Sequence, residues 1–418
     1  MRFTMAIGNV TECAIGRWNL IGNVTEAVHC RKLPAAFFQG AVFAVSQRQP
    51  AEIGDTIENI DTPALIVDLD AFEHNLDKMA AIAAAAGVRL RPHAKTHKSP
   101  TIAHMQIRRG AVGVCCQKVS EAEVMVLNGV ADVLVSNQIV GARKLRRLAA
   151  LARRARIGVC VDNAANVADL GAAATEAGVK LDVLIEVNVM QARCGVAPGS
   201  ATAELAAVIG RTAGLHFRGL HAYHGKAQHY AGFAERAAAI AEAVEQIRDT
   251  LGLIRAQGQD CEIVTGSGTG TFEFEAASGV FNELQVGSYV FMDASYGRIL
   301  DRGGAPIDVF EQSLFVLATI MSLPAENRMV CDAGLKALSV DSGLPLVVDN
   351  EGVEYLAASD EHGSLRLDRT NRSFSLGDKL RLIPGHCDPT VNLYDWFVCV
   401  RRGRVEEIWP ISARGMLV

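Results

Sequence analysis

The 418-residue sequence is poor in three features that would each point to a particular class of protein. It has no uninterrupted apolar run near the roughly 18 residues that span a bilayer, so it predicts no membrane partner. Its 41 Lys and Arg stand against 46 Asp and Glu, and the net charge of -5 leaves no basic field for nucleic acid. Its ten cysteines are too sparse for a disulfide scaffold and show no CxxC spacing, so we expect reduced thiols in a cytoplasmic protein.

The composition predicts a folded chain. Half of the residues are hydrophobic and 21% are charged, whereas a disordered chain needs low hydrophobicity and high net charge. A prior of about 150 residues per domain gives two or three domains, although one barrel of about 250 residues would absorb most of the length. We interpret residues 1–55 as an N-terminal extension, disordered or non-native, and their scattered basic residues leave a transit peptide open.

Between residues 56 and 303, short apolar runs alternate with Ala-rich amphipathic stretches. Counting a first run at 64–67 and a strand expected near Arg89 gives about eight strands separated by helices, which predicts an α/β fold of the (β/α)8 TIM-barrel type. A doubly wound open sheet is the alternative. The other predicted strands are 113–116, 133–136, 157–161, 183–187, 219–223, 263–266 and 283–287. The predicted helices are 70–86, 119–128, 141–156, 163–177, 201–212 and 232–256.

The C-terminal part, residues 304–418, has a different texture. Short strand-like runs are separated by Gly, Asp and Asn, a pattern typical of an antiparallel sheet domain. The predicted strands are 314–320, 329–332, 346–348, 354–358, 379–383, 396–401 and 404–408.

Polar motifs directly follow several barrel strands, where the active sites of barrels are built. RPHAKTHK, residues 91–98, offers a lysine for a Schiff base with a carbonyl, although a solvated basic loop is the favoured interpretation of this segment alone. TGSGTG, residues 265–270, suits a phosphate but is a weak signal. Three histidines in residues 221–229 are interpreted most economically as supplying one catalytic base.

A further motif lies in the C-terminal domain. His386 and Asp388 stand two residues apart, so on an extended strand they would point to one face and bind one divalent ion, with Cys387 pointing away. Two protein ligands completed by water suit Mn²⁺ or Mg²⁺ better than structural zinc. A lone polar turn is the alternative.

Taken together and in order, these motifs resemble the pyridoxal-phosphate enzymes of the alanine-racemase-like barrel type, within them the D-threonine aldolase and D-serine dehydratase group. The resemblance runs from about residue 61 to residue 415. It rests on DTPALIVDLD, RPHAKTHKS, VGVCCQKVSEAE, QARCGV, GLHAYHGKAQHY, TGSGTGT, NELQVGSYVFMD and HCDPTVNLYD.

The resemblance implies a pyridoxal 5'-phosphate site. Lys95 matches the Schiff-base lysine, and Arg193 matches the arginine that contacts the phenolic oxygen of the cofactor. At Gln285 the sequence carries a neutral residue where alanine racemases place an arginine against the pyridine nitrogen. The remaining matches lie beside the ring or in the phosphate loop: Tyr223, His224, Gly268, Thr269 and Gly270.

The resemblance also implies a metal site and a reaction. His386 and Asp388 match the metal ligands, and Asp388 is the aldolase-like choice where dehydratases carry Cys. His229 matches the residue proposed as base for the β-hydroxyl. The implied reaction is retro-aldol cleavage of a D-3-hydroxy amino acid to glycine and an aldehyde, in a homodimer.

Substrate preference is split among the motifs. The stretches 284–298, 332–345 and 386–396 are closest to 3-hydroxy-D-aspartate aldolases, which make glycine and glyoxylate, whereas HAYHGKAQHY and QARCGV are equally like D-threonine aldolases. We hypothesise that Arg298 supplies positive charge for a β-carboxylate, against the alternative of a surface arginine. The rival functions are a D-serine or 3-hydroxyaspartate dehydratase and a non-catalytic cofactor-binding protein.

Overall fold

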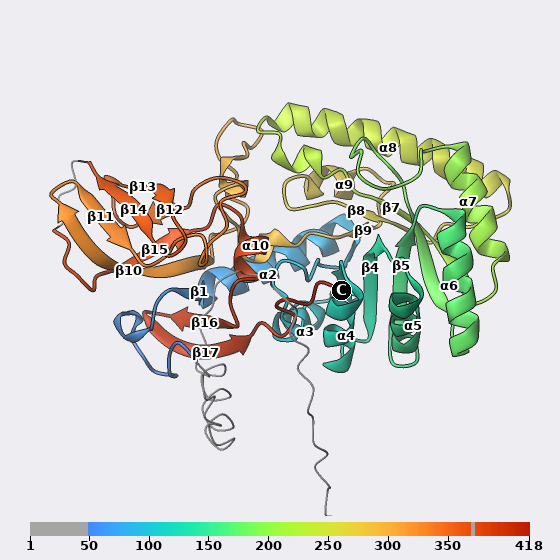
Figure 1. The fold of residues 1–418 in the computed structure, drawn as a ribbon. Helices are drawn as coiled ribbons and strands as arrows, with labels where there is room; N and C mark the ends of the chain where they lie inside the picture. Colours follow the sequence, from blue (N-terminus) through green and yellow to red (C-terminus); the bar gives the residue numbers. More distant parts are fainter. Residues whose placement is uncertain (1–48, 369–372) are drawn as a thin grey trace, which may run out of the picture. The chain divides into compact units, whose positions relative to one another are not determined.

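The structure is a computed structural model that describes residues 49–368 and 373–418, and it contains two sheets of different kinds (Figure 1). One is an eight-stranded parallel sheet surrounded by helices, and the other is a mainly antiparallel sheet built largely from the C-terminal residues. The predicted fold class is therefore confirmed. In the part of the chain described here, no helix is both long and apolar enough to span a membrane.

The parallel sheet forms a barrel. Its strands, in spatial order, are β2 (Arg89–Leu90), β9 (Glu283–Leu284), β8 (Ile263–Gly266), β7 (Leu215–Ala222), β6 (Leu181–Glu186), β5 (Arg156–Val161), β4 (Asp132–Gln138) and β3 (Val114–Cys116). Its two outer strands approach each other just past β2. There the Cys115 N–H donates to the Pro92 carbonyl and the Ala94 N–H donates to the Cys115 carbonyl, both at 2.8 Å. These bonds join β3 to the continuation of β2 and close the ring of strands.

Helices cover the outer face of the barrel. They are α2 (Leu69–Ala86), α3 (Pro100–Arg108), α4 (Val119–Leu127), α5 (Ala142–Leu151), α6 (Ala164–Ala177), α7 (Ser200–Arg211), α8 (Phe233–Ala256) and α9 (Phe272–Ala277). The six predicted helices are confirmed, and the short α3 and α9 are additional. Alternate strand residues such as Val133, Val159 and Val183 are fully buried beneath these helices, as the period of two in a strand requires.

The barrel interior is filled in two layers. Leu134, Cys160 and Leu184 point inward and form a small apolar cluster with Cys115 and Ile263. A smaller pocket lies on the amino side of this cluster, lined by charged residues such as Arg91, Asp132 and Asp182.

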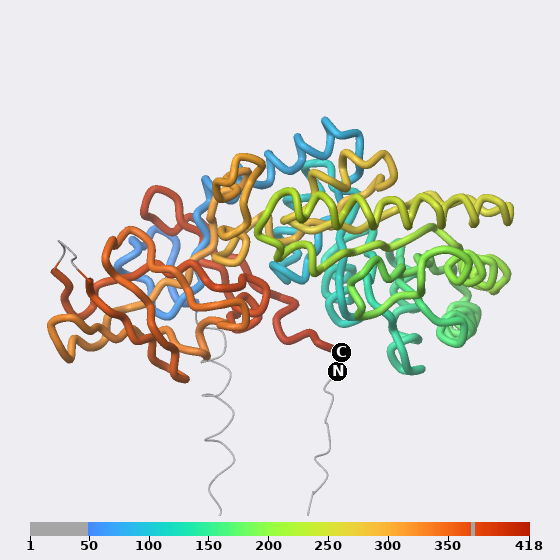
Figure 2. The backbone as a smooth tube through the Cα atoms, turned by 90° about the horizontal axis from the view of Figure 1, so that it is seen from above, coloured from blue at the N-terminus to red at the C-terminus, as the bar shows by residue number. Residues whose placement is uncertain are grey.

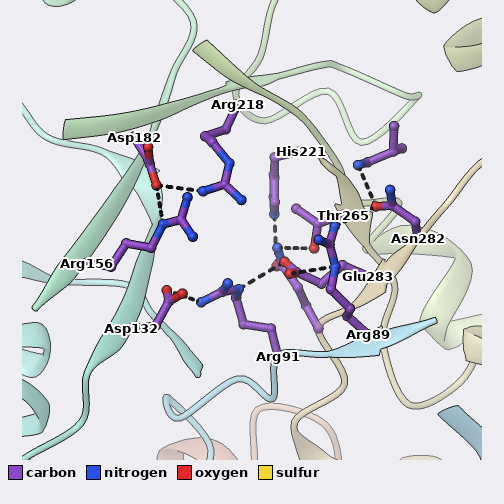
Figure 3. Close-up of polar contacts among 12 residues, drawn as sticks. Arg89, Arg91, Asp132, Arg156, Asp182, Arg218, His221, Thr265, Asn282 and Glu283 are labelled. Atoms are coloured by element: carbon purple, nitrogen blue, oxygen red, sulfur yellow. Dashed lines mark hydrogen bonds and ion pairs between the residues drawn. The ribbon is translucent and has the colours of Figure 1, made fainter. Parts of the chain in front are cut away.

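Charged residues form the layer at the amino ends of the strands (Figure 3). Arg91 donates to Asp132 at 2.6 Å and to Glu283 at 3.0 Å. Asp182 accepts hydrogen bonds from two further arginines, Arg156 and Arg218. The buried charges are therefore paired, as burial requires.

The second sheet follows the order β13-β14-β11-β10-β1-β16-β17, and β15 joins it through β10 and carries β12. Its strands are β1 (Ala64–Asp68), β10 (Leu314–Ala325), β11 (Arg328–Cys331), β12 (Leu346–Val348), β13 (Val353–Ala358), β14 (Gly363–Leu367), β15 (Lys379–Ile383), β16 (Trp396–Arg401) and β17 (Arg404–Pro410). One side of this sheet packs in the same apolar cluster as α2 and the η4 turn (Ser288–Val290) of the barrel.

The prediction that run 64–67 is the first barrel strand is wrong. This strand, β1, pairs antiparallel with β10 and parallel with β16 in the second sheet. The barrel has eight strands without it, because Arg89–Leu90 is the first. An apolar run buried on both faces has the same appearance in either sheet, so its pattern alone does not assign it. Helix α2 then leads to the barrel, starting where the Asp68 carboxylate accepts from the Asp70 and Ala71 N–H groups.

Both ends of the described chain are held by backbone contacts. Most of the predicted extension, residues 1–48, lies outside the described residues. Residues 49–55 pack on β17, with Ala51 buried and the Gly54 N–H donating to the Val405 carbonyl at 2.8 Å. At the other end the chain, red in Figure 2, reaches the barrel, where the Val418 carbonyl accepts from the Ser120 N–H at 2.9 Å.

Candidate active site

A cavity opens at the carboxyl ends of the barrel strands. Six of the predicted cofactor residues line it: Lys95, Arg193, Tyr223, Gly268, Thr269 and Gln285. Residues that the sequence reasoning did not assign also line it, among them His93, Gln117, Ser136, His221 and Tyr296. The cavity therefore gathers residues from at least six strands or strand ends, as expected for a barrel active site.

Lys95 is the amine of this cavity. It follows β2, and its side chain is 40% exposed toward the open mouth. The second lysine of the motif, Lys98, is buried and forms an ion pair with Glu121 at 2.5 Å, so it does not compete for this role. Lys95 instead contacts the Asp388 carboxylate. Burial alone would lower the pKa of Lys95, but the Asp388 charge more than offsets it and the pKa lies above its ordinary value.

The loop after β8 forms one wall of the cavity. Ser267 has a positive φ of 78°, and the glycines that follow let the backbone turn closely beside Gln228. The Thr269 hydroxyl is buried without a hydrogen-bond partner among the described residues. A buried polar atom without a partner is rare in folded proteins and marks a position where a polar ligand fits.

A neutral hydrogen-bond chain lies deeper in the cavity. Gln285 accepts from the His221 ring nitrogen Nε2 at 3.1 Å and donates through its amide to the Thr265 hydroxyl at 2.9 Å. Burial lowers the pKa of His221, so its ring is neutral. His221 and Thr265 converge in Figure 3 next to the Arg91–Glu283 pair. Gln285 thus presents a neutral amide to the cavity, with its oxygen bonded to His221 and one amide N–H bonded to Thr265.

His93 is a wall residue that the sequence reasoning missed. Gln117 donates to its Nε2 at 2.9 Å, and Ser136 lies 3.2 Å from the same atom. Burial, with Lys95 nearby, holds the pKa of His93 well below its usual value. The available signal was its place in the same motif two residues before Lys95, directly after a strand.

The loop that carries Arg193 lies at the rim. The Asp162 carboxylate accepts from the Gly195 N–H at 2.9 Å, and Ala192 has a positive φ of 53° within this turn. The Arg193 guanidinium is 4.0 Å from Glu186 and its side chain is 53% exposed. The loop thus holds a cation at the cavity edge, at the outer limit of ion-pair distance from Glu186.

Two of the predicted cofactor residues, His224 and Gly270, and the predicted base His229 do not line the cavity. His224 is buried and packs edge-on against Tyr230, with ring centroids 6.3 Å apart. Gly270 lies behind the wall, where its N–H donates to Gln228 at 2.9 Å. His229 is exposed at the end of the short helix η3 (Lys226–His229).

The predicted metal pair lies above the cavity at the start of the short helix α10 (Cys387–Val391). The expectation that His386 and Asp388 share one face of an extended strand is therefore wrong, because Pro389 and Thr390 continue a helical turn. Cys387 is buried between them, and its N–H donates to the Asp293 carboxylate at 2.9 Å.

Two side-chain contacts define this pair. His386 Nδ1 donates to Asp341 at 2.8 Å, which leaves Nε2 as an acceptor. Asp388 contacts Lys95, and although burial raises the pKa of this carboxyl, Lys95 and His386 bring it well below the usual value. Within residues 49–368 and 373–418 no cluster of three or more His, Cys, Asp or Glu has a metal-binding arrangement.

Arg298 lies in the η5 turn (Tyr296–Arg298), beside this pair rather than in the cavity wall. Its guanidinium donates to the Ser342 carbonyl at 2.7 Å. Ser342 adjoins Asp341, the partner of His386. The guanidinium is thus linked through one loop to the predicted metal ligand.

Comparisons with known proteins agree with this architecture. Residues 67–295 match the family model described as alanine racemase, N-terminal domain. Residues 313–400 match the family model described as putative serine dehydratase domain.

Characterised relatives match almost end to end. A D-threonine aldolase from an Arthrobacter species is 47% identical over 90% of this chain and 99% of its own length. A 3-hydroxy-D-aspartate aldolase from Paracoccus denitrificans is 46% identical over 88% of this chain and 95% of its own length. A D-threo-3-hydroxyaspartate dehydratase from a Delftia species is 30% identical over 80% of this chain and 93% of its own length. The crystal structure of a D-threonine aldolase from Filomicrobium marinum superposes with a TM-score of 0.86 at 50% identity, covering 88% of this chain and all of that one.

Proposed function

Because this chain belongs to the D-threonine aldolase and 3-hydroxy-D-aspartate aldolase family of alanine-racemase-like proteins, we propose that it is an aldolase dependent on pyridoxal phosphate and a divalent metal. It cleaves D-3-hydroxy amino acids between Cα and Cβ to glycine and an aldehyde. The observation that carries the proposal is the contact between Lys95 and Asp388. It brings the amine proposed for the cofactor and the carboxylate proposed for the metal together from two different parts of the fold.

The cavity suits pyridoxal phosphate. Lys95 supplies the amine, and the unpartnered Thr269 hydroxyl supplies a donor for a phosphate at the Gly-rich loop. Arg193 offers a cation to the phenolic oxygen, and Gln285 offers a neutral amide to the ring nitrogen. When bound, the cofactor supplies the sink for the electrons released at Cα.

His386 and Asp388 suit a hard divalent cation, Mn²⁺ or Mg²⁺. The bond from His386 Nδ1 to Asp341 leaves the Nε2 lone pair available, and the Asp388 carboxylate is ionised. Two protein ligands leave positions for water and substrate. A metal held there supplies Lewis acidity toward the β-hydroxyl.

The chain's own residues then divide the remaining tasks. Lys95 carries a positive charge beside the Asp388 carboxylate and would have to give up a proton to hold the cofactor, while the neutral His93 adds no competing cation. His229 is proposed to take the proton of the β-hydroxyl. Replacing it by Asn should lower kcat and leave the absorbance of the Lys95 imine unchanged. Loss of that absorbance would instead assign His229 to cofactor binding.

We propose 3-hydroxy-D-aspartate as the main substrate and D-threonine as the second candidate, which the 47% identity to a D-threonine aldolase supports. Arg298 supports the first, since its guanidinium donates to the carbonyl of Ser342, the residue next to Asp341, and Asp341 is the partner of His386. The test is kcat/KM for both substrates in Arg298→Ala. We expect a selective loss on 3-hydroxy-D-aspartate, and an unchanged ratio would remove Arg298 from the proposal.

The dehydratase and the non-catalytic binder are the rival functions. Asp388 stands where the resemblance places Cys in dehydratases, and the proposed metal pair and second sheet argue against a binder. Glycine release from D-threonine or 3-hydroxy-D-aspartate, followed by NMR in the presence of Mn²⁺, tests the proposed function against both. Absence of glycine would refute it.

A homodimer and a cytoplasmic location complete the proposal. The dimer rests on the resemblance alone, and light scattering after size exclusion tests it. For the location, the eight described cysteines are all free, which suits a reducing compartment.

A further inference from the structure

Gln228 is a buried residue of η3 that no part of the proposed mechanism uses. Its side-chain oxygen accepts from the Gly270 N–H at 2.9 Å, and its amide donates to the Thr271 hydroxyl at 2.7 Å. Its residue exposure is 1%. One side chain thus ties η3 to the loop that carries Thr269.

The loop is shaped around this side chain. A Cβ built on Gly268 would lie 2.5 Å from the Gln228 side-chain oxygen, and one built on Gly270 would lie 3.0 Å from the Gln228 carbonyl. A larger residue at Gly268 would therefore displace the Gln228 side chain, and one at Gly270 would crowd the Gln228 backbone. The two glycines of the motif therefore serve the contact with Gln228 as well as the turn itself.

The contact continues behind the loop. The Thr271 hydroxyl donates to the buried Glu275 carboxyl at 2.8 Å, so Gln228, Thr271 and Glu275 form one chain on the side of the loop away from the cavity. On the cavity side the Thr269 hydroxyl remains without a partner among the described residues. These hydrogen bonds thus engage donors and acceptors on one face of the loop and leave the other face for a ligand.

We propose that Gln228 is a positioning residue that holds the 268–270 loop in its phosphate-binding form and couples this loop to the η3 segment ending at His229. The inference rests on the proposed function, because the ligand of the loop is the phosphate of the cofactor. Loss of a buried hydrogen bond to a backbone N–H corresponds to about a 10-fold weakening of phosphate binding, up to about 100-fold.

The test compares two forms of the cofactor that differ in the phosphate. The cofactor is removed from the full-length protein, which is then titrated with pyridoxal phosphate or with pyridoxal while the imine absorbance is recorded. Gln228→Met keeps the side-chain length and removes both hydrogen bonds. Gln246→Met is the matched control, because Gln246 is a half-buried residue of α8 away from the cavity, and its amide donates to Glu242 at 3.5 Å.

We expect Gln228→Met to raise the Kd of pyridoxal phosphate at least 10-fold, to change that of pyridoxal less than 2-fold, and to lower kcat at saturating cofactor. Equal changes for both ligands, or no change, would overturn the inference. If Gln228→Met does not fold, Thr271→Val is titrated in its place. An unchanged ratio of the Kd of pyridoxal phosphate to the Kd of pyridoxal in Thr271→Val would also overturn the inference. A wild-type protein that forms no imine with pyridoxal phosphate would refute the proposed function itself, whatever the variants do.

Discussion

Glu275 offers a quantitative prediction, because it is a buried carboxyl whose charge state differs between the folded and unfolded chain. It lies on α9 with 1% exposure, and one of its oxygens accepts from Thr271 while the other has no partner among the described residues. Burial, only partly offset by the Thr271 hydrogen bond, raises its pKa from 4.5 to about 8.

Proton linkage determines whether the protein becomes more or less stable as the pH rises. The folded chain keeps this proton up to about pH 8, whereas the unfolded chain releases it near 4.5, so stability falls as pH rises through this window. At about 1.4 kcal/mol per pKa unit, the loss between pH 5 and pH 8 is about 3.5 kcal/mol. Glu275→Gln keeps an acceptor for Thr271 and removes the titration.

The assay is the urea-unfolding free energy of the holoenzyme at pH 5, 6, 7 and 8, for the wild type and Glu275→Gln. The difference between the two proteins cancels other titrating groups. We expect the unfolding free energy of Glu275→Gln, relative to that of the wild type, to increase steadily from pH 5 to pH 8. Parallel pH profiles would refute the reasoning, because they would show that Glu275 ionises alike in both states.

Three further predictions concern the cavity and the layer beneath it. Lys95→Ala should abolish the imine absorbance and lower kcat at least about 1000-fold; retained absorbance would assign the amine elsewhere. Chelation should lower kcat of the wild type and added Mn²⁺ should restore it, whereas Asp388→Ala should not respond to Mn²⁺; equal responses in both would remove Asp388 from the metal site. Arg91→Met removes the 3.0 Å ion pair of the buried Glu283 and leaves it only the longer 3.7 Å contact with Arg89 among the described residues, so the unfolding free energy should fall by up to about 3–5 kcal/mol; a loss below 1 kcal/mol would contradict this role of the pair.

The sequence predicted the barrel well because period and spacing survive without tertiary information. Strands 133–136, 157–161 and 263–266 lie within or match observed strands, and the six long helices differ from prediction mainly at their ends. Run 64–67 was misassigned because its partners, β10 and β16, come from residues about 250 and 330 positions later. Local pattern carries no information on such pairing.

The candidate site divides in the same way. Six residues predicted from motif matches line one cavity, because each follows a strand of the barrel. Asp388 required the C-terminal domain to fold over the barrel, and the helical turn at α10 was missed because five residues carry too little period to detect. His93 and Gln228 act through buried side-chain contacts, which a sequence shows only as polar letters inside a motif.

The most direct test of the central claim is product stoichiometry from 3-hydroxy-D-aspartate with the purified holoenzyme and Mn²⁺. We expect one glycine and one glyoxylate for each substrate molecule consumed, with no ammonia. Ammonia and a keto acid in place of glycine would contradict it and assign the chain to dehydration.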